Sequence, residues 1–145
     1  MKEELKLKIS ELKKDNIIDH AEKLFSELGI ENTTIDVIAK SAGISKRTVY
    51  TYFSSKTELY NAILYRANKD MYEYFYILIQ KKEFISLKPK EKLNALWSAL
   101  INFKTEKNLY FKIITMYENQ KEDISTTDEY LKKSYEWGQK IHLIL

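Results

Sequence analysis

The sequence predicts an all-α fold, and three observations support that prediction. The chain has 145 residues but only three glycines and one proline, so it has few points at which a helix must end. Apolar side chains recur three and four residues apart along most of the chain, which is the spacing of an amphipathic helix. The sequence shows no polar–apolar alternation of the kind that marks a strand, no short repeat and no low-complexity tract.

Composition excludes several classes of function. The chain has no cysteine, which rules out a thiolate nucleophile, a zinc–thiolate site and a disulfide. His20 and His142 lie far apart in the sequence and form no ligand pair, so we expect no metal and no cofactor. No run approaches the ~18 apolar residues of a membrane span and no signal peptide opens the chain, so a soluble cytoplasmic protein is expected. The net charge of +3 is mild, so nucleic-acid binding would depend on local charge.

The first predicted helix ends at Leu28. Its apolar face consists of Ile17, Ala21, Leu24, Phe25 and Leu28. Gly29 follows at the position where helices often end on a left-handed residue. The preceding stretch KEELKLKISELKK allows two interpretations. It extends the helix back to Lys2, or it is a mobile basic arm and the helix starts near Ser10.

The next two predicted helices are short and form a helix-turn-helix. Thr33 and Asp36 have the spacing of a capping box, so a helix should start at Thr33–Asp36 and end at Ala42–Gly43. Ser45 can cap a second helix that runs through Tyr52. Gly43 suits the turn between them because glycine tolerates a positive φ.

Four longer helices are predicted to follow. The sequence S-K-T-E at residues 55–58 is a helix start, and that helix should continue to about residue 82. Pro89 marks the first turn of the next helix, which runs through Phe103. Another spans residues 109–117, and Ser125 caps the last one, which reaches the chain end. We therefore expect a helix-turn-helix domain over residues 1–56, with its core at 10–56, and a second helical domain over residues 57–145.

The second helix of a helix-turn-helix enters the major groove of DNA with its first turn against the base edges. Lys46 and Arg47 occupy that turn, and an arginine can bind guanine O6 and N7 with two hydrogen bonds. Between residues 33 and 56 the basic residues exceed the acidic ones by three. The expected phosphate contacts from this reasoning are Thr33, Thr34, Ser45, Tyr50, Tyr52 and Lys56. Val49 and Phe53 are four apart and should be core. The pattern alone also fits an ordinary helical hairpin with a polar face.

Residues 17–64, IIDHAEKLFSELGIENTTIDVIAKSAGISKRTVYTYFSSKTELYNAIL, resemble the N-terminal domain of the tetracycline-repressor (TetR) family. The resemblance rests on A-x-x-L-F-x-x-x-G, T-T-x-x-x-I-A, A-G-I-S, T-V-Y-x-Y-F and S-K-x-x-L in register. It implies a homodimeric transcription regulator, usually a repressor, that reads a near-palindromic operator in double-stranded DNA. Lys46 and Arg47 take base-reading positions, and many relatives have glycine at position 47. Thr48 joins the residues that touch phosphates or brace the helix.

The resemblance also implies that the later helices form a pocket for a small effector whose binding moves the long fourth helix. Aromatic residues lie in that region, and they would suit a flat hydrophobic, aromatic or cationic compound. The candidate pocket residues are Tyr74, Phe75, Trp97, Phe103, Phe111, Tyr117, Tyr130 and Trp137. Aromatic residues at helical spacing can equally form the core.

The chain departs from the family at its end. Family members usually continue with two late antiparallel helices that form a four-helix dimer interface, whereas this sequence stops at the apolar segment WGQKIHLIL. Either the chain is a truncated product or it forms an unusual dimer, and we expect truncation. A helical interaction protein without operator binding is the alternative to a ligand-released regulator. An enzyme is disfavoured because Glu118, Glu122 and Asp123 fall in a polar connector without a neighbouring nucleophile.

Overall fold

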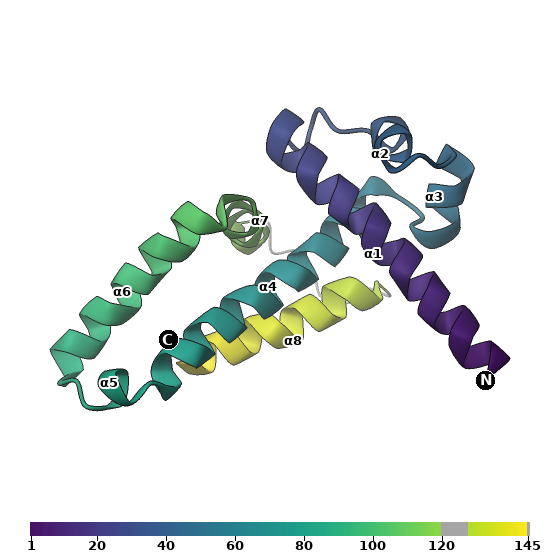
Figure 1. Cartoon of the computed structure of the whole chain (residues 1–145). Coiled ribbons are helices and arrows are strands. Elements are labelled where there is room, and N and C mark those ends of the chain that lie inside the picture. Colours follow the sequence, from purple (N-terminus) through teal and green to yellow (C-terminus); the bar gives the residue numbers. More distant parts are fainter. Residues whose placement is uncertain (120–127, 145) are drawn as a thin grey trace. The chain divides into compact units, whose positions relative to one another are not determined.

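The computed structural model of the chain describes residues 1–119 and 128–144, and this part is helical without a strand (Figure 1). The predicted all-α fold is confirmed. The helices are α1 (Lys2–Leu28), α2 (Ile35–Ala42), α3 (Lys46–Tyr52), α4 (Lys56–Gln80), α5 (Lys82–Ile85), α6 (Pro89–Glu106), α7 (Asn108–Asn119) and α8 (Glu129–Ile144). The chain forms two compact units, Met1–Tyr60 and Asn61–Leu145, and the division falls inside α4. No described helix is long and apolar enough to cross a membrane.

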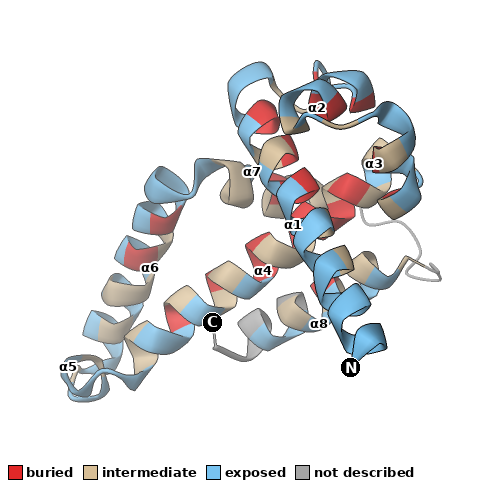
Figure 2. Cartoon of the chain, turned by 45° about the vertical axis from the view of Figure 1, so that its right-hand side comes forward, coloured by how far each residue is buried: buried red, intermediate tan, exposed pale blue. Residues whose placement is uncertain are grey.

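Helix α1 is continuous from Lys2, so the extended-helix interpretation is right and the mobile arm is wrong. Its two halves differ in burial. Its C-terminal half packs into the first unit through Ile17, Ile18, Ala21, Leu24 and Phe25, which are all buried. Its first turns are exposed, and Figure 2 shows this change from exposed to buried along α1.

The turn from α1 to α2 satisfies the last carbonyls of α1 with side chains. Asn32 Nδ2 donates to the Leu28 carbonyl at 3.0 Å. Thr33 is fully buried, and its hydroxyl donates to the carbonyls of Gly29 at 2.8 Å and Leu24 at 3.2 Å. Carbonyls at a helix end lack partners within the helix, so Thr33 stabilises the end of α1.

The predicted cap of α2 at Thr33 is therefore wrong by one residue. Thr34 has the extended backbone that a helix cap needs, with φ −106° and ψ 161°. Its hydroxyl accepts a hydrogen bond from the Val37 N–H at 3.3 Å. The T-x-x-D spacing suggested a cap at Thr33, but that hydroxyl is already used by α1.

Thr33→Val should lower the free energy of unfolding of the first unit by about 1–2 kcal/mol, because one buried and one partly buried carbonyl lose a donor without a change in side-chain shape. Urea unfolding followed by circular dichroism measures this loss. Affinity for DNA, measured on the folded fraction, should stay unchanged. A loss of DNA affinity at unchanged stability would instead mean that Thr33 contacts phosphate, as the sequence suggested.

The helix-turn-helix forms as predicted. Gly43 adopts the left-handed conformation, with φ 67° and ψ 30°, and its N–H donates to the carbonyls of Ala39 and Lys40. Ser45 caps α3 by accepting a hydrogen bond from the Thr48 N–H at 3.1 Å. Ile38, Val49 and Phe53 are fully buried, which confirms Val49 and Phe53 as core and fixes the outward face of α3.

The second unit has its own apolar core, formed between α4, α6 and α7. Met71, Phe75, Ala99 and Phe103 make up the buried cluster, and neighbouring aromatic and aliphatic side chains pack around it. Pro89 occupies the first turn of α6 as predicted. The sequence did not predict α5, which is a single four-residue turn.

Helix α8 lies along α4 and is joined to it by polar side chains (Figure 1). Asn68 Nδ2 donates to the Ser134 carbonyl at 3.2 Å, and Asn61 Nδ2 donates to Asp128 Oδ2 at 2.7 Å. Both asparagines are buried.

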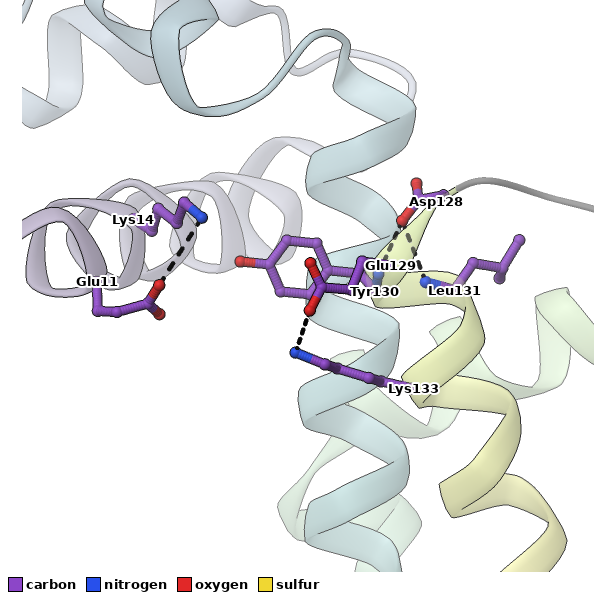
Figure 3. A network of polar contacts seen from close by, with 7 residues as sticks. All are labelled: Glu11, Lys14, Asp128, Glu129, Tyr130, Leu131 and Lys133. Carbon is purple, nitrogen blue, oxygen red and sulfur yellow. Dashed lines mark hydrogen bonds and ion pairs between the residues drawn. The ribbon is translucent and has the colours of Figure 1, made fainter. Parts of the chain in front are cut away.

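Asp128 also caps α8 by accepting hydrogen bonds from the N–H groups of Tyr130 and Leu131 (Figure 3). The predicted cap Ser125 and the connector residues Glu122 and Asp123 lie outside the described residues. The same holds for the side chains of the apolar chain end, 141–145.

Candidate nucleic-acid interface

The exposed face of α3 is built by the helix-turn-helix. Burial of Val49 on one side turns Lys46, Arg47 and Tyr50 toward solvent. Tyr50 is 46 % exposed. The face therefore presents two cations and a phenol, which are groups that can bind base edges and phosphates.

The first turn of α3 is fixed by two hydroxyls. Ser45 Oγ lies 2.8 Å from Thr48 Oγ1, and it also accepts from the Thr48 N–H. This pairing holds the turn that carries Lys46 and Arg47 in place. Ser45 and Thr48, both predicted to contact DNA, thus also brace the helix that presents the basic pair.

The charge of Lys46 is offset by a neighbouring acid. Lys46 Nζ lies 3.1 Å from Asp36 Oδ2 on α2, and both side chains are at least half exposed. The hydrogen bond that Lys46 donates to Asp36, together with the negative charge of that carboxylate, raises the pKa of Lys46. Among the described residues Arg47 has no ion-pair partner, and it is the cation that α3 leaves unneutralised.

Asp36→Asn should raise the affinity for DNA about two- to fivefold at low salt, because it removes a negative charge from the exposed face and releases Lys46. Fluorescence anisotropy with a labelled duplex at low and high salt measures this gain, which should shrink as salt rises. Glu31→Gln, an exposed acid outside the helix-turn-helix, serves as the matched control. A fall in affinity for Asp36→Asn would show that the ion pair positions Lys46 for DNA.

The other predicted phosphate contacts differ in how accessible they are. Thr34 is exposed at the start of α2, whereas Thr33 is buried and turned toward α1. Tyr52 is half-buried and lines an apolar groove with α1. The structure thus brings most of the predicted residues to the surface of α2 and α3 and removes Thr33 from it.

Lys56 lies at the start of α4, where a carboxylate is already present. Glu58 Oε2 accepts hydrogen bonds from the N–H and the hydroxyl of Ser54, both at 2.6 Å. Ser55 Oγ accepts from the Glu58 N–H at 3.2 Å. A phosphate that binds beside Lys56 would meet this carboxylate. The sequence identified Glu58 as part of a helix start but did not indicate that its carboxylate binds Ser54.

The candidate pocket aromatics separate into three groups. Tyr74, Phe75, Phe103 and Phe111 gather in the core of the second unit. Tyr130 and Trp137 project from α8 onto Tyr65 and Tyr72 of α4, with ring centroids 6.3 Å and 5.1 Å apart. Trp97 is 64 % exposed on α6, and Tyr117 is partly buried on α7.

A cavity of about 420 Å³ lies between α4 and α6, within the size range of small-ligand sites. Tyr74 is the candidate aromatic that lines it, beside Leu78 and Ala99. Lys81, Ser98 and Asn102 supply polar groups at its wall. No group of three His, Cys, Asp or Glu side chains that could hold a metal occurs in the described part of the chain.

The fold and the basic face of α3 together define a helix-turn-helix protein of the kind that binds DNA. Residues 17–63 match the family described as bacterial regulatory proteins, tetR family. This match assigns the helix-turn-helix segment of the chain to the TetR family of regulators.

The similar proteins agree with this assignment. The chain is 33 % identical over 113 residues to IcaR of Staphylococcus aureus, a negative transcriptional regulator of a biofilm operon, covering 77 % of this chain and 57 % of IcaR. It thus spans a little over half the length of the first curated relative. YhgD of Bacillus subtilis, an HTH-type transcriptional regulator, is 39 % identical over 59 residues, which are 41 % of this chain and 31 % of YhgD.

Solved structures match over most of the chain. The TetR-family regulator PfmR of Thermus thermophilus has a TM-score of 0.60 at 25 % identity, covering 86 % of this chain and 63 % of PfmR. KstR2 of Mycobacterium tuberculosis has a TM-score of 0.61 at 19 % identity, covering 90 % of this chain and 63 % of KstR2, and supports the fold alone.

Proposed function

We propose that this protein binds double-stranded DNA through α3 and represses transcription. The observation that carries the proposal is the exposed first turn of α3, where Arg47 keeps an unpaired positive charge among the described residues and Ser45 and Thr48 hydrogen-bond across the turn. Repression is favoured because the relative IcaR is a negative regulator.

We further propose that the protein acts as a homodimer on a palindromic operator. One helix-turn-helix presents one α3 to DNA, and two linked copies gain affinity because the second contact becomes intramolecular. Light scattering at several concentrations tests pairing, since a dimer has twice the mass of the 17.3 kDa chain. A monomer at all concentrations would contradict this part of the proposal.

Release by a small hydrophobic or aromatic molecule completes the proposal. The cavity between α4 and α6 supports it, because Leu78 and Ala99 give it an apolar wall and Tyr74 adds a hydroxyl. Lys81 would favour a compound that carries an acidic group.

The experiment that tests DNA binding is a salt titration. Each phosphate contact releases counterions, so log K should fall with log salt concentration at a slope of about −0.9 per contact. Anisotropy of a labelled random duplex and of a duplex enriched by selection from a random pool gives both slopes. An affinity independent of salt, or no binding at low salt, would favour the alternative of a helical interaction protein.

A further inference from the structure

The N-terminal half of α1 carries an apolar stripe that is largely exposed. Leu5, Ile9 and Leu12 are 59 %, 43 % and 62 % exposed. They are followed by Asn16, and the four positions are spaced by four, three and four residues. This is the spacing of the core positions of a coiled coil, in which an asparagine at one core position fixes the register of the partner helix. We call these four residues the α1 seam.

The α1 seam leads into a groove in the same unit. This groove has a volume of about 310 Å³ and is lined by Ile9, Leu12 and Ile17 of α1 together with Ile44, Thr48 and Tyr52. The groove is concave because α1 forms one of its walls and α3 the other. A lipid surface would instead contact a stripe that faces outward, so the groove does not suit it. A small molecule could fill the groove but would leave Leu5 uncovered. A helix covers both.

The charged residues beside the α1 seam indicate which kind of partner helix would bind. The positions that flank the α1 seam are Lys6 and Lys13 on one side and Lys8 and Asp15 on the other. The acidic residues Glu3, Glu4 and Glu11 lie on the opposite side of the helix by the same periodicity. Three lysines against one aspartate make the border of the α1 seam positive.

A second copy of α1 fits this border poorly. In a parallel pair Lys8 of one copy meets Lys13 of the other. In an antiparallel pair Lys6 meets Lys13 while Lys8 meets Asp15, so attraction only offsets repulsion, whereas a helix with acidic flanks attracts all three lysines. Like charges at flanking positions disfavour pairing. We infer that the α1 seam and its groove bind an amphipathic helix of a partner protein whose apolar face is flanked by acidic residues. Because Thr48 and Tyr52 line the groove, the bound helix excludes DNA from α3. This last consequence rests on the proposed function.

The probe is a synthetic three-heptad peptide with Ile and Leu at its core positions, one Asn to face Asn16, and Glu at all flanking positions. A second peptide has Lys in place of every flanking Glu. Anisotropy of each labelled peptide, titrated with the full chain, should show that the acidic peptide binds at least about tenfold more tightly than the basic one.

The chain offers a matched pair of variants. Leu5→Glu changes the α1 seam, and Leu7→Glu makes the same change at a site that is 67 % exposed and lies away from the seam. Leu5→Glu should weaken binding of the acidic peptide about tenfold or more, and Leu7→Glu less than about twofold. Equal effects of the two variants, equal binding of the two peptides, or no binding would each overturn the proposal.

Two other occupants give different results. If the chain forms dimers that Leu5→Glu separates, a second copy covers the α1 seam and the proposal is wrong. Co-sedimentation with anionic vesicles that depends on Leu5 would assign the face to a lipid surface and would equally overturn it.

Displacement of a labelled duplex by the acidic peptide supports the competition with DNA, and simultaneous binding of both contradicts it. If the chain binds no duplex, the proposed function fails, while the peptide titration still decides the docking.

Discussion

Replacing Phe103 by alanine should lower the free energy of unfolding of the second unit by about 3–5 kcal/mol, the largest effect expected of any change considered. Phe103 is completely buried. Its ring meets Tyr74 edge-on at a centroid distance of 5.5 Å, and it belongs to the buried cluster with Met71, Phe75 and Ala99. Alanine removes a whole ring and leaves a cavity that a packed helical core cannot fully close.

The two tryptophans, Trp97 and Trp137, both lie in the second unit, so their fluorescence in urea follows this unit while circular dichroism follows both. The matched control is Trp97→Ala, on the same helix as Phe103 but 64 % exposed. It should change stability by less than about 0.5 kcal/mol, and Trp137 remains as its probe.

This pair of variants also decides between the two interpretations that the sequence left open for the aromatic residues. A phenylalanine that lines an empty ligand site already has space beside it, so alanine would cost little stability there. A small effect of Phe103→Ala, similar to that of Trp97→Ala, would therefore show that Phe103 faces a pocket. The large effect is expected because the cavity near Tyr74 is lined by Leu78 and Ala99 and does not include Phe103.

The helix-turn-helix could be predicted because its determinants are local. Gly43 and Ser45 each act within a few residues of their own position: the first supplies a left-handed turn and the second caps the next helix. The start of α6 at Pro89 is local in the same sense. Such features depend on backbone preferences that the residue type itself determines.

What could not be predicted depends on how elements pack. The hydroxyl of Thr33 binds the carbonyl of Leu24, nine residues earlier, and this contact exists only once α1 has ended. The ion pair of Lys46 with Asp36 requires the crossing of α2 and α3. Helix α5 is one turn long, too short for a periodic pattern. Spacing also cannot separate Phe103 from Trp97, because a helix places both at intervals that fit a core or a surface.

Replacing Arg47 by alanine should weaken binding to the preferred DNA site by about 1–3 kcal/mol and relax the preference at one base pair. Arg47 is exposed on the first turn of α3 and keeps its charge free of an ion pair within the described residues. Its carbonyl accepts a hydrogen bond from the Thr51 hydroxyl at 3.1 Å, which adds to the order of this turn. The preferred site comes from selection on random duplexes, and each variant is measured on single-base changes of that site.

Arg47→Lys separates charge from geometry. Lysine keeps the positive charge, so binding to random DNA and its salt slope should stay near those of the parent chain. It lacks the planar fork that binds guanine O6 and N7 together, so preference at that base pair should fall as it does for alanine. If lysine restores the preference fully, Arg47 acts through its charge on a phosphate and does not read a base.

Lys56→Ala should change DNA affinity without changing base preference, which is the opposite of the effect expected for Arg47. Lys56 is the first residue of α4, and the Glu58 carboxylate binds Ser54 at the same helix start. A phosphate contact there should weaken all sequences by similar factors and reduce the salt slope by about one contact. Unchanged affinity for Lys56→Ala would show that Glu58 already excludes a phosphate from this helix start.

Unchanged binding of Arg47→Ala to both preferred and random DNA would contradict the assignment of α3 as the reading helix. The unpaired charge of Arg47 is what distinguishes this α3 from an ordinary polar helix face.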